Sequence, residues 1–151
     1  MSAEPAAAPA PPRPAEPAVV RLPQAVHTFD VDFAGVVSNL RYPGWAELWR
    51  EELARRCGVS LPDMLRAGSL PLLVRQELNF RRPLRFGESV SLEGWVERVG
   101  TSSFTLWMEV RDAATGELCA DCRQVLVMTD LRSRRSVALP EELRRQLAQH
   151  A

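Results

Sequence analysis

The chain has 151 residues, of which 46% are hydrophobic and 25% charged, a composition that predicts one globular domain rather than a fibrous or disordered protein. Its nineteen basic residues, all arginine, balance nineteen acidic residues, so the net charge gives no reason to expect nucleic acid or an anionic membrane surface as a partner. No apolar run approaches the roughly 18 residues that a membrane-spanning helix needs, and no secretory signal pattern is present, so no membrane association is expected.

The first segment, residues 1–23, is rich in alanine and proline. Proline breaks helices and lacks the amide hydrogen that a sheet needs, so this segment is predicted to be a disordered arm. The folded domain is expected to span residues 24–151. Residues 24–32 are predicted to form a strand that leads into a loop.

Apolar residues then recur at helical spacing from Trp45 to Leu53, with charged residues between them. This pattern predicts one amphipathic helix that ends at Gly58. Ser38 or Asn39 is the expected N-cap, because a short polar side chain can accept a hydrogen bond from the first free amides of a helix.

Four strands are predicted after a short helical turn at residues 60–68. Apolar and polar residues alternate in the first strand, where only Gln76 breaks the pattern, and Phe104, Leu106, Met108 and Val110 share one face of the third. The predicted strands occupy residues 71–80, 89–99, 103–112 and 117–131, and a short helix over residues 140–150 closes the chain.

This order of elements predicts an α+β fold in which a curved antiparallel sheet wraps around one long central helix. A single sheet with strongly apolar strands leaves edges and one face uncovered, and a second copy of the chain would cover them. We therefore expect a homodimer or a homotetramer.

Three cysteines, Cys57, Cys119 and Cys122, are too few and too odd in number for a disulfide framework. A reducing compartment is the default, so a cytoplasmic location is expected. Cys119 and Cys122 have C-x-x-C spacing, but residues three apart in a strand face opposite sides, and zinc would need two further ligands. We therefore expect no metal site.

The stretch "DVDFAG", residues 30–35, gives a D-x-x-G pattern directly before the predicted helix. In a strand-helix-four-strand chain of this size, the pattern resembles the hotdog-fold acyl-CoA thioesterases, in particular the 4-hydroxybenzoyl-CoA thioesterase-like branch. The resemblance covers about Val26 to Asp130 and includes the "FRRPLRFGESV" stretch before the third strand. It implies a hotdog fold, no cofactor, and hydrolysis of an acyl-CoA thioester to the free acid and CoA.

The resemblance assigns the catalytic carboxylate to Asp32, three residues before Gly35, as general base or nucleophile. An acid buried among apolar neighbours would have its charged form disfavoured, which would raise its pKa into a useful range. The backbone amides near the helix start, that of Asn39 above all, would stabilise the oxyanion, and Gly35 would let the substrate approach the backbone. Asp30 is expected to be structural, and an N-cap role for Asn39 stays open.

Other candidates line the expected substrate path. Arginine makes bidentate contacts with phosphate, so arginines near strand ends could bind CoA, although any surface strand of this chain carries several. Glu47 matches an acidic position of the helix in the family, or is a solvated ion-pair residue. The candidate substrate-binding residues are Ser38, Tyr42, Arg81, Arg82 and Ser103, with Arg85 and Arg98 as further phosphate candidates.

The loop departs from the pattern G-H-V-N-N-x-x-Y of many relatives. It reads "GVVSNLRY", so Val36 replaces the histidine and Ser38 the first asparagine, while Asn39 and Tyr42 remain. This departure argues against an acyl-carrier-protein-directed role and resembles branches that act on aromatic or short acyl-CoA esters. The two alternatives to a thioesterase are a hotdog dehydratase or hydratase and a non-catalytic acyl-CoA-binding protein. The first would need a paired histidine and aspartate, yet His27 precedes the loop.

Overall fold

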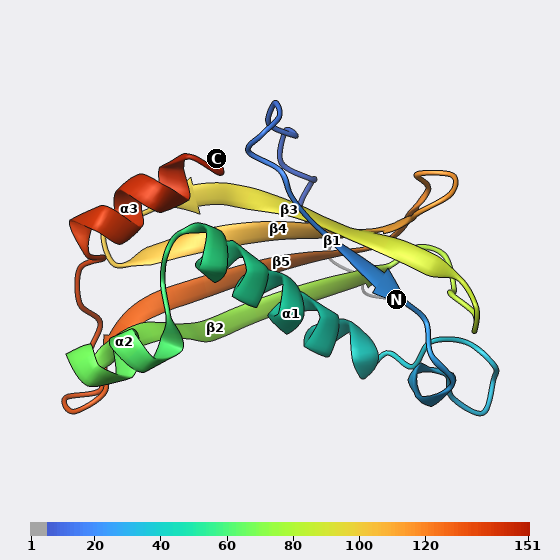
Figure 1. Ribbon diagram of the computed structural model, residues 1–151, viewed down its shortest axis with the longest axis horizontal. Coiled ribbons are helices and arrows are strands. Elements are labelled where there is room, and N and C mark those ends of the chain that lie inside the picture. The colour runs from blue at the N-terminus through green and yellow to red at the C-terminus, as the bar shows by residue number, and fades with distance from the viewer. Residues whose placement is uncertain (1–5) are drawn as a thin grey trace.

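The structure, a computed structural model, describes residues 6–151, which form a five-stranded antiparallel sheet and three α-helices (Figure 1). The strand order is β1-β3-β4-β5-β2, so β1 and β2 are the edge strands. In chain order the elements are β1 (Val20–Ala25), the 3-10 helix η1 (Thr28–Asp30), α1 (Arg41–Arg56), α2 (Leu61–Ala67), β2 (Ser69–Phe80), β3 (Ser89–Val99), β4 (Ser103–Asp112), β5 (Leu118–Asp130) and α3 (Glu141–Ala148).

The long helix α1 lies across one face of the curved sheet (Figure 1). Its buried side chains recur at the three- and four-residue spacing of one helical face, namely Tyr42, Trp45, Ala46, Trp49 and Leu53. Burying this apolar face against the sheet is the main contribution that holds the helix in place. The predicted α+β arrangement of a hotdog fold is therefore confirmed.

The centre of the helix-sheet contact is a close approach between Trp49 and Gly94 of β3. The Trp49 side chain is completely buried, and its indole Nε1 donates a 3.0 Å hydrogen bond to the carbonyl of Val20. A Cβ atom at position 94 would lie 2.4 Å from the Trp49 ring, so only glycine leaves room for this indole. The bond to Val20 also ties the helix to edge strand β1.

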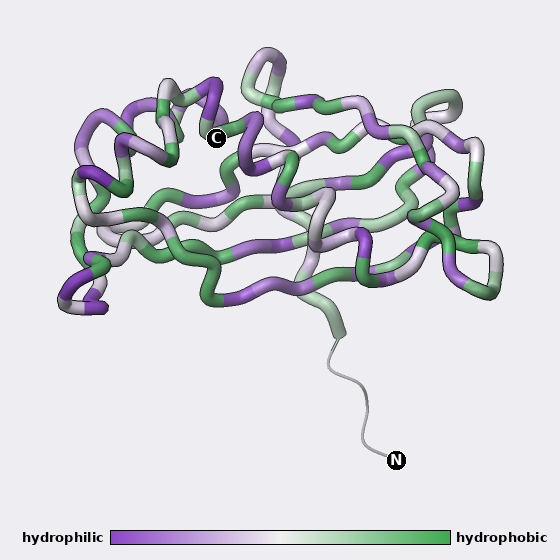
Figure 2. Tube along the Cα trace, turned by 60° about the horizontal axis from the view of Figure 1, so that its bottom comes forward, coloured by the Kyte–Doolittle hydropathy of each residue, from purple (hydrophilic) through white to green (hydrophobic). Residues whose placement is uncertain are grey.

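Of the patterns predicted for the strands, the shared apolar face of β4 is present, whereas the alternation predicted for β2 is not matched by burial, because no residue of that edge strand is fully buried. Hydrophobic and hydrophilic residues are interspersed along the strands (Figure 2). The side chains of Phe104, Leu106, Met108 and Val110 on β4 share the face toward α1, and all four are buried. The sheet thus forms one side of a single main core.

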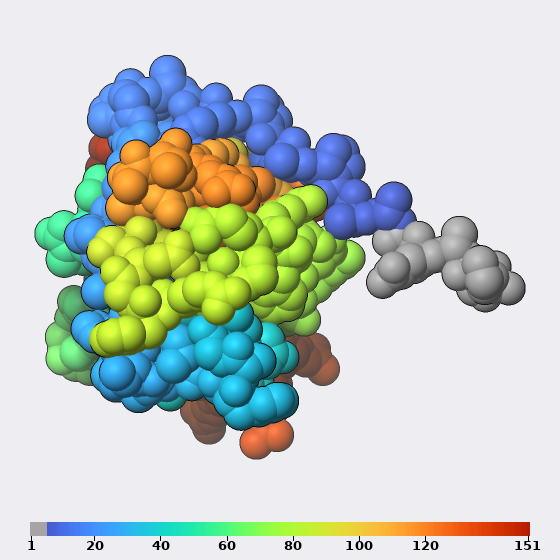
Figure 3. All heavy atoms as spheres, turned by 90° about the vertical axis from the view of Figure 1, so that its right-hand side faces the viewer, coloured from blue at the N-terminus to red at the C-terminus, as the bar shows by residue number. Residues whose placement is uncertain are grey.

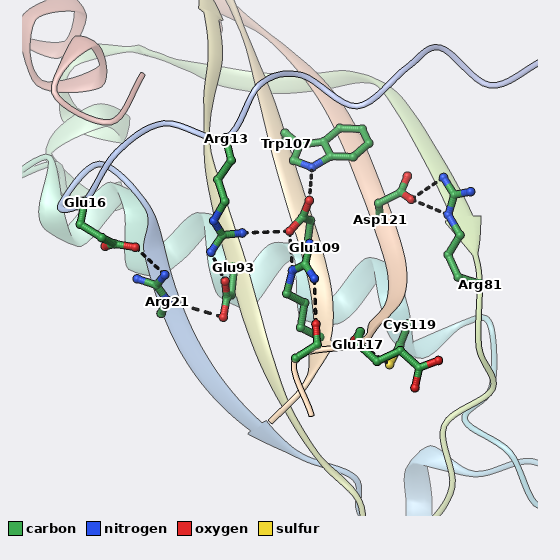
Figure 4. Close-up of polar contacts among 12 residues, drawn as sticks. Arg13, Glu16, Arg21, Arg81, Glu93, Trp107, Glu109, Glu117, Cys119 and Asp121 are labelled. Carbon is green, nitrogen blue, oxygen red and sulfur yellow. Dashed lines mark hydrogen bonds and ion pairs between the residues drawn. The ribbon is translucent and has the colours of Figure 1, made fainter. Parts of the chain in front are cut away.

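The outer face of the sheet carries a row of acids on three adjacent strands. Glu93, Glu109 and Asp121 are cross-strand neighbours in the β3-β4 and β4-β5 registers. Like charges directly opposite one another are unfavourable, so each needs a cation. The cations include Arg13 from the N-terminal arm, which pairs with Glu93 and, at 3.0 Å, with Glu109 (Figure 4).

The prediction for the N-terminal region is partly wrong. β1 begins at Val20, four residues before the expected domain boundary, and the segment 26–32 does not continue it as a strand. Most side chains of residues 6–17 are exposed, but Ala18 and Val19 are buried, and Val19 joins Trp95 and Trp107 in a second apolar cluster; the segment forms the blue upper edge of Figure 3. Pro23 is tolerated since β1 is an edge strand. Residues 1–5 lie outside the described residues.

The other boundaries agree with the predictions to within two or three residues. β3 and β4 coincide with them, and β2 begins two residues earlier. The predicted caps of α1 are wrong, because Leu40 is the N-cap and has no side-chain capping bond. The loop instead closes on Ser38, whose hydroxyl accepts from the Leu40 amide at 3.3 Å and whose carbonyl accepts from the Arg41 amide at 2.9 Å.

Candidate functional site

Asp30 is a structural residue of the loop before α1. It is only 3% exposed, and its carboxylate accepts a 2.8 Å hydrogen bond from the backbone amide of His27, which closes the turn of η1. The guanidinium Nε of Arg41 lies 3.6 Å from the same carboxylate. Because the chain turns here, Asp30 and Asp32 do not share an extended backbone.

Asp32 begins a tight turn that Gly35 completes. The Asp32 amide donates to the carbonyl of Val36 at 2.9 Å, and the Gly35 amide donates to the carbonyl of Asp32 at 3.0 Å. Gly35 has a φ of 75°, in the left-handed region that favours glycine. The Asp32 carboxylate accepts from the amide of Ala34 at 2.8 Å, which fixes its direction.

The expectation that Asp32 is buried or half-buried is wrong for the single chain. Asp32 is exposed, and neighbouring Phe33 projects completely into solvent because the turn points outward from the sheet. Only Val37, which follows the turn, is buried, and its amide bonds the carbonyl of Leu84 at 2.8 Å. This bond brings the loop beside the segment before β3, seen as cyan next to yellow-green in Figure 3.

The Asp32 side chain nevertheless lines a cavity of about 350 Å³, which we call the Asp32 cavity. This volume falls within the range of about 300–1,000 Å³ that is typical of small-molecule sites. The cavity brings together five of the predicted site residues, namely Asp32, Asn39, Tyr42, Arg81 and Arg82. Phe80 and Pro83 also line it, and sequence reasoning missed both because neither carries a reactive group.

The start of α1 supplies a free donor beside Asp32. Among the described residues, the backbone amide of Asn39 donates no hydrogen bond, whereas the amides of Ser38, Leu40 and Arg41 all do. It lies two residues before a 16-residue helix, where the helix dipole favours negative charge. A developing anion in the cavity would meet this amide.

The wall opposite the loop is aromatic. Tyr42 is 3% exposed, and its ring meets the ring of Phe80 edge-on, with centroids 5.0 Å apart. Burial raises the pKa of the Tyr42 hydroxyl to about 12. Tyr42 is therefore a neutral wall of the cavity rather than an acid or base near neutral pH.

Both arginines of the cavity are already engaged by carboxylates. Arg81 donates from Nε at 2.9 Å to buried Asp121 and also lies 2.8 Å from it through Nη2 (Figure 4). Arg82 donates to Glu88 at 2.8 Å and to Asp112 at 2.7 Å. Their charges are therefore largely compensated, which weakens the case for either as a dedicated phosphate ligand.

The remaining candidates lie elsewhere. Ser38 is used in the loop turn, and Ser103 starts β4 opposite Val127, outside the Asp32 cavity. Arg85 and Arg98 do not line that cavity either.

Glu47 lines a second cavity of about 390 Å³ between α1, α2, the start of β2 and α3. We call it the Arg50 cavity, because Arg50, Glu47 and Glu51 are its charged residues and the rest of its lining is apolar. Sequence reasoning missed this cavity, because its lining comes from elements far apart in the chain and no local pattern marks it.

The comparisons with known proteins agree with this fold. The model of the thioesterase-like superfamily matches residues 26–147, which is most of the chain. The chain belongs to the thioesterase-like superfamily. The family match includes the Asp32 turn, the start of α1 and every strand from β2 to β5.

Similar proteins within and around the superfamily were found by sequence and by structure. YneP of Bacillus subtilis (strain 168), provisionally named an acyl-CoA thioesterase, is 29% identical over 68 residues, which cover 45% of this chain and 49% of YneP. The chain thus spans about half the length of this relative. PA5185 of Pseudomonas aeruginosa has a TM-score of 0.78 at 27% identity, covering 91% of this chain and 95% of that chain.

Slr0204 of Synechocystis, a 1,4-dihydroxy-2-naphthoyl-CoA thioesterase, has a TM-score of 0.81 at 20% identity, with 86% and 96% coverage of the two chains. At this identity the likeness supports the fold. Within the described part of the chain, none of the helices is both long and apolar enough to cross a membrane.

Proposed function

We propose that this member of the thioesterase-like superfamily hydrolyses an acyl-CoA thioester to the free acid and CoA. The observation that carries the proposal is that Asp32 and Asn39, whose backbone amide donates no hydrogen bond in the described chain, line one cavity at the start of α1. Thioester hydrolysis needs a group that activates water or attacks first, and a donor for the oxyanion that forms on the carbonyl. These two groups meet both needs without a metal or cofactor.

In the general-base route, Asp32 takes a proton from water while the water oxygen attacks the thioester carbonyl. Negative charge then develops on the carbonyl oxygen, which accepts from the Asn39 amide. The tetrahedral intermediate collapses by breaking the carbon-sulfur bond, and the CoA thiolate takes up the proton as it leaves. In the nucleophilic route, Asp32 attacks the carbonyl itself, the carbon-sulfur bond breaks and the CoA thiolate leaves. Water then hydrolyses the resulting anhydride to the free acid and the Asp32 carboxylate, and the proton released from water is taken up by the thiolate.

A homodimer or homotetramer would complete this site. β2 is an edge strand of 12 residues, and its start exposes Leu72, Leu73 and Val74 at 41%, 41% and 59%. An apolar edge strand of this length is a place for a second copy to pair. Phe80 ends the same strand, is 54% exposed and lines the Asp32 cavity. A copy on this edge would therefore cover Asp32 and remove it from bulk water.

The cytoplasm is the proposed location, because all three cysteines are free and buried rather than paired. The hydratase alternative gains no support from the site. His27 lines a different cavity, shared with Asp30, and stacks on Phe29 with ring centroids 5.0 Å apart. No histidine of the described chain lines the Asp32 cavity.

The test is CoA release from a panel of acyl-CoA esters by the wild type and Asp32→Asn, with Asp63→Asn, an exposed aspartate of α2, as the matched control. Loss of a general base or nucleophile is expected to lower kcat by about 10²-fold or more while the acyl-CoA still binds. Equal turnover by wild type and Asp32→Asn would contradict the role of Asp32. Binding of acyl-CoA without turnover by the wild type would instead favour the non-catalytic alternative.

A further inference from the structure

Arg50 of α1 is a half-buried cation whose partner is neutral. Its guanidinium donates to the side-chain oxygen of Gln124 on β5, and in the described chain no carboxylate lies within 4.0 Å of it. The arginines of the Asp32 cavity contrast with it, because both Arg81 and Arg82 are held by carboxylates. A guanidinium away from water is unfavourable unless its charge is compensated.

Gln124 adds a second donor without an acceptor. Its side chain is completely buried, and over residues 6–151 its Nε2 has no hydrogen-bond partner. Buried amide N–H groups are almost always satisfied, so an unsatisfied one next to a cation requires an explanation. Arg50 and Gln124 together offer several N–H donors with nothing to receive them.

Of these two residues, Arg50 lies at the Arg50 cavity, whose lining is otherwise mainly apolar, whereas buried Gln124 does not line it and holds the guanidinium through its side-chain oxygen. Arg50 lines the cavity directly, as do Leu106, which pairs with Gln124 across β4 and β5, and Leu126, two residues along from Gln124. Glu47 and Glu51 also line it, from the exposed side of α1. Burial, the largest cause, lowers the pKa of Arg50, whereas the charges of Glu47 and Glu51 act to raise it, although in the described chain neither carboxylate forms an ion pair with the guanidinium.

The Arg50 cavity and the Asp32 cavity lie toward opposite ends of one seam between α1 and β2. Tyr42 meets Phe80 at the Asp32 end, while Leu53 and Leu72 line the other cavity, so the strand runs back alongside the helix (Figure 1). From Tyr42 to Arg50 the helix advances by about 12 Å, given 1.5 Å per residue. The two cavities share no lining residue, so an acyl group whose thioester sits beside Asp32 must pass along this seam to reach Arg50.

We propose that Arg50 and Gln124 form a specificity site for acyl groups that carry a carboxylate at the end remote from the thioester. The planar guanidinium of Arg50 would donate to the two carboxylate oxygens, while the side-chain oxygen of Gln124 holds the guanidinium in place. An acyl chain with an apolar end would offer Arg50 no acceptor and is disfavoured. The inference rests on the proposed function and names the substrate class of the same enzyme.

The test measures kcat/KM for matched pairs of dicarboxylyl and fatty acyl-CoA esters, such as adipoyl with hexanoyl, suberyl with octanoyl and sebacyl with decanoyl. The wild type is expected to prefer the dicarboxylyl ester of at least one pair by about tenfold to a hundredfold, the size of one charged hydrogen-bonding interaction. Arg50→Met keeps the length of the side chain and is expected to abolish the preference while leaving or raising activity on the fatty acyl ester. Arg50→Lys should retain part of it.

Gln124→Met is the second variant and is expected to reduce the preference less than Arg50→Met. Arg55→Met, which removes an exposed arginine of the same helix that pairs with Glu52, is the matched control and should change nothing. The inference is overturned if the wild type prefers the fatty acyl ester of every pair. It is also overturned if Arg50→Met leaves the preference for the dicarboxylyl ester intact. A change in the oligomeric state alone would overturn it too, because a second copy of the chain would then supply the acceptor that Arg50 lacks.

The two proposals fail separately. If no ester releases CoA, the proposed function fails, and calorimetric binding of suberyl-CoA and octanoyl-CoA to the same proteins then decides the inference. Tighter binding of suberyl-CoA that is lost in Arg50→Met would sustain the site as a recognition site. Equal binding of both esters would overturn it.

Discussion

Arg13 and Glu109 are 96 positions apart in the chain, yet the guanidinium of Arg13 donates a 3.0 Å hydrogen bond to the carboxylate of Glu109 on the outer face of the sheet. The same guanidinium lies 5.4 Å from the ring centroid of Trp95, a cation–π contact. Glu109 is 5% exposed, so its charge depends on such partners. The N-terminal arm is therefore part of the folded structure.

Replacing Arg13 by alanine is expected to lower the free energy of unfolding by about 1–2 kcal/mol, because it removes charged hydrogen bonds from a buried carboxylate. Urea denaturation followed by tryptophan fluorescence would measure the change. Arg132→Ala serves as the control, since Arg132 has no ion pair in the described chain. An unchanged urea midpoint for Arg13→Ala would mean that the arm contributes nothing to the free energy of unfolding in solution.

Replacing Arg81 by methionine is expected to destabilise the fold rather than only weaken binding of CoA. Asp121 is completely buried and would keep only the 2.8 Å bond from Asn79. Because Arg81 itself is half exposed, the loss should be about 2–3 kcal/mol, at the lower end for a broken buried pair. The double variant Arg81→Met with Asp121→Asn should recover part of the loss. A large rise in KM for acyl-CoA at unchanged stability would instead favour a phosphate ligand.

The contact between Glu88 and Arg82 predicts that the free energy of unfolding depends on pH. A hydrogen bond from Arg82, the largest cause, holds the pKa of the Glu88 carboxyl below its ordinary 4.5. The stabilisation is therefore fully present above pH 4.5 and is lost as the pH falls through the lower pKa of the folded state. Since both side chains are still partly exposed, at 27% and 28%, the contribution of the pair should be about 1 kcal/mol or less.

The measurement compares urea unfolding of the wild type and Glu88→Gln at pH 7 and at pH 3. The variant should be less stable at the higher pH, and the difference should shrink at the lower one. Glu141→Gln, at a side chain 90% exposed, is the control. A constant difference at both pH values would rule out the linkage.

Gly94→Ala is expected to destabilise the core by about 1–3 kcal/mol, as overpacking usually does. The added methyl would lie 2.4 Å from the Trp49 ring and 2.5 Å from the carbonyl of Trp107, so either the helix or the sheet must shift. Gly44→Ala is a matched control, because a Cβ there meets nothing within 4 Å and alanine favours the helix. Thermal unfolding should show opposite shifts for the two variants, and a neutral Gly94→Ala would contradict the close approach.

Much of the fold could be predicted because periodicity is a local signal. The recurring apolar residues of α1 and the alternation in β3 and β4 each lie within one element, so their boundaries follow from the sequence. The arm could not be predicted in this way. Its composition suggests disorder, whereas Arg13 finds acids 80 and 96 positions away that no local pattern connects to it.

In the candidate site too, the features that a sequence pattern predicts differ from the contacts that form only in the folded chain. Asp32 was identified through its resemblance to a known D-x-x-G loop, and the 3-10 turn η1, which ends at Asp30, has no periodic signature. The partners of Arg81 and Arg82 come from β5 and from the β4-β5 region, so their compensation by carboxylates appears only in three dimensions. Gln76 stands out in the sequence because it breaks the alternation of its strand. It could not be linked to Arg50 or Gln124 until the structure aligned the strands.

The burial of all three cysteines has a practical consequence for the chemistry of labelling. Burial raises the pKa of the Cys57 thiol to about 11 and that of Cys122 to about 12, and it also raises the pKa of Cys119. Reagents such as aromatic disulfides and maleimides react with thiolates, so the folded protein should remain almost inert to them at neutral pH. If such a reagent is used to detect free thiols during turnover, the colour that develops reports liberated coenzyme. A background that grows with time in the absence of substrate would report unfolding of the protein.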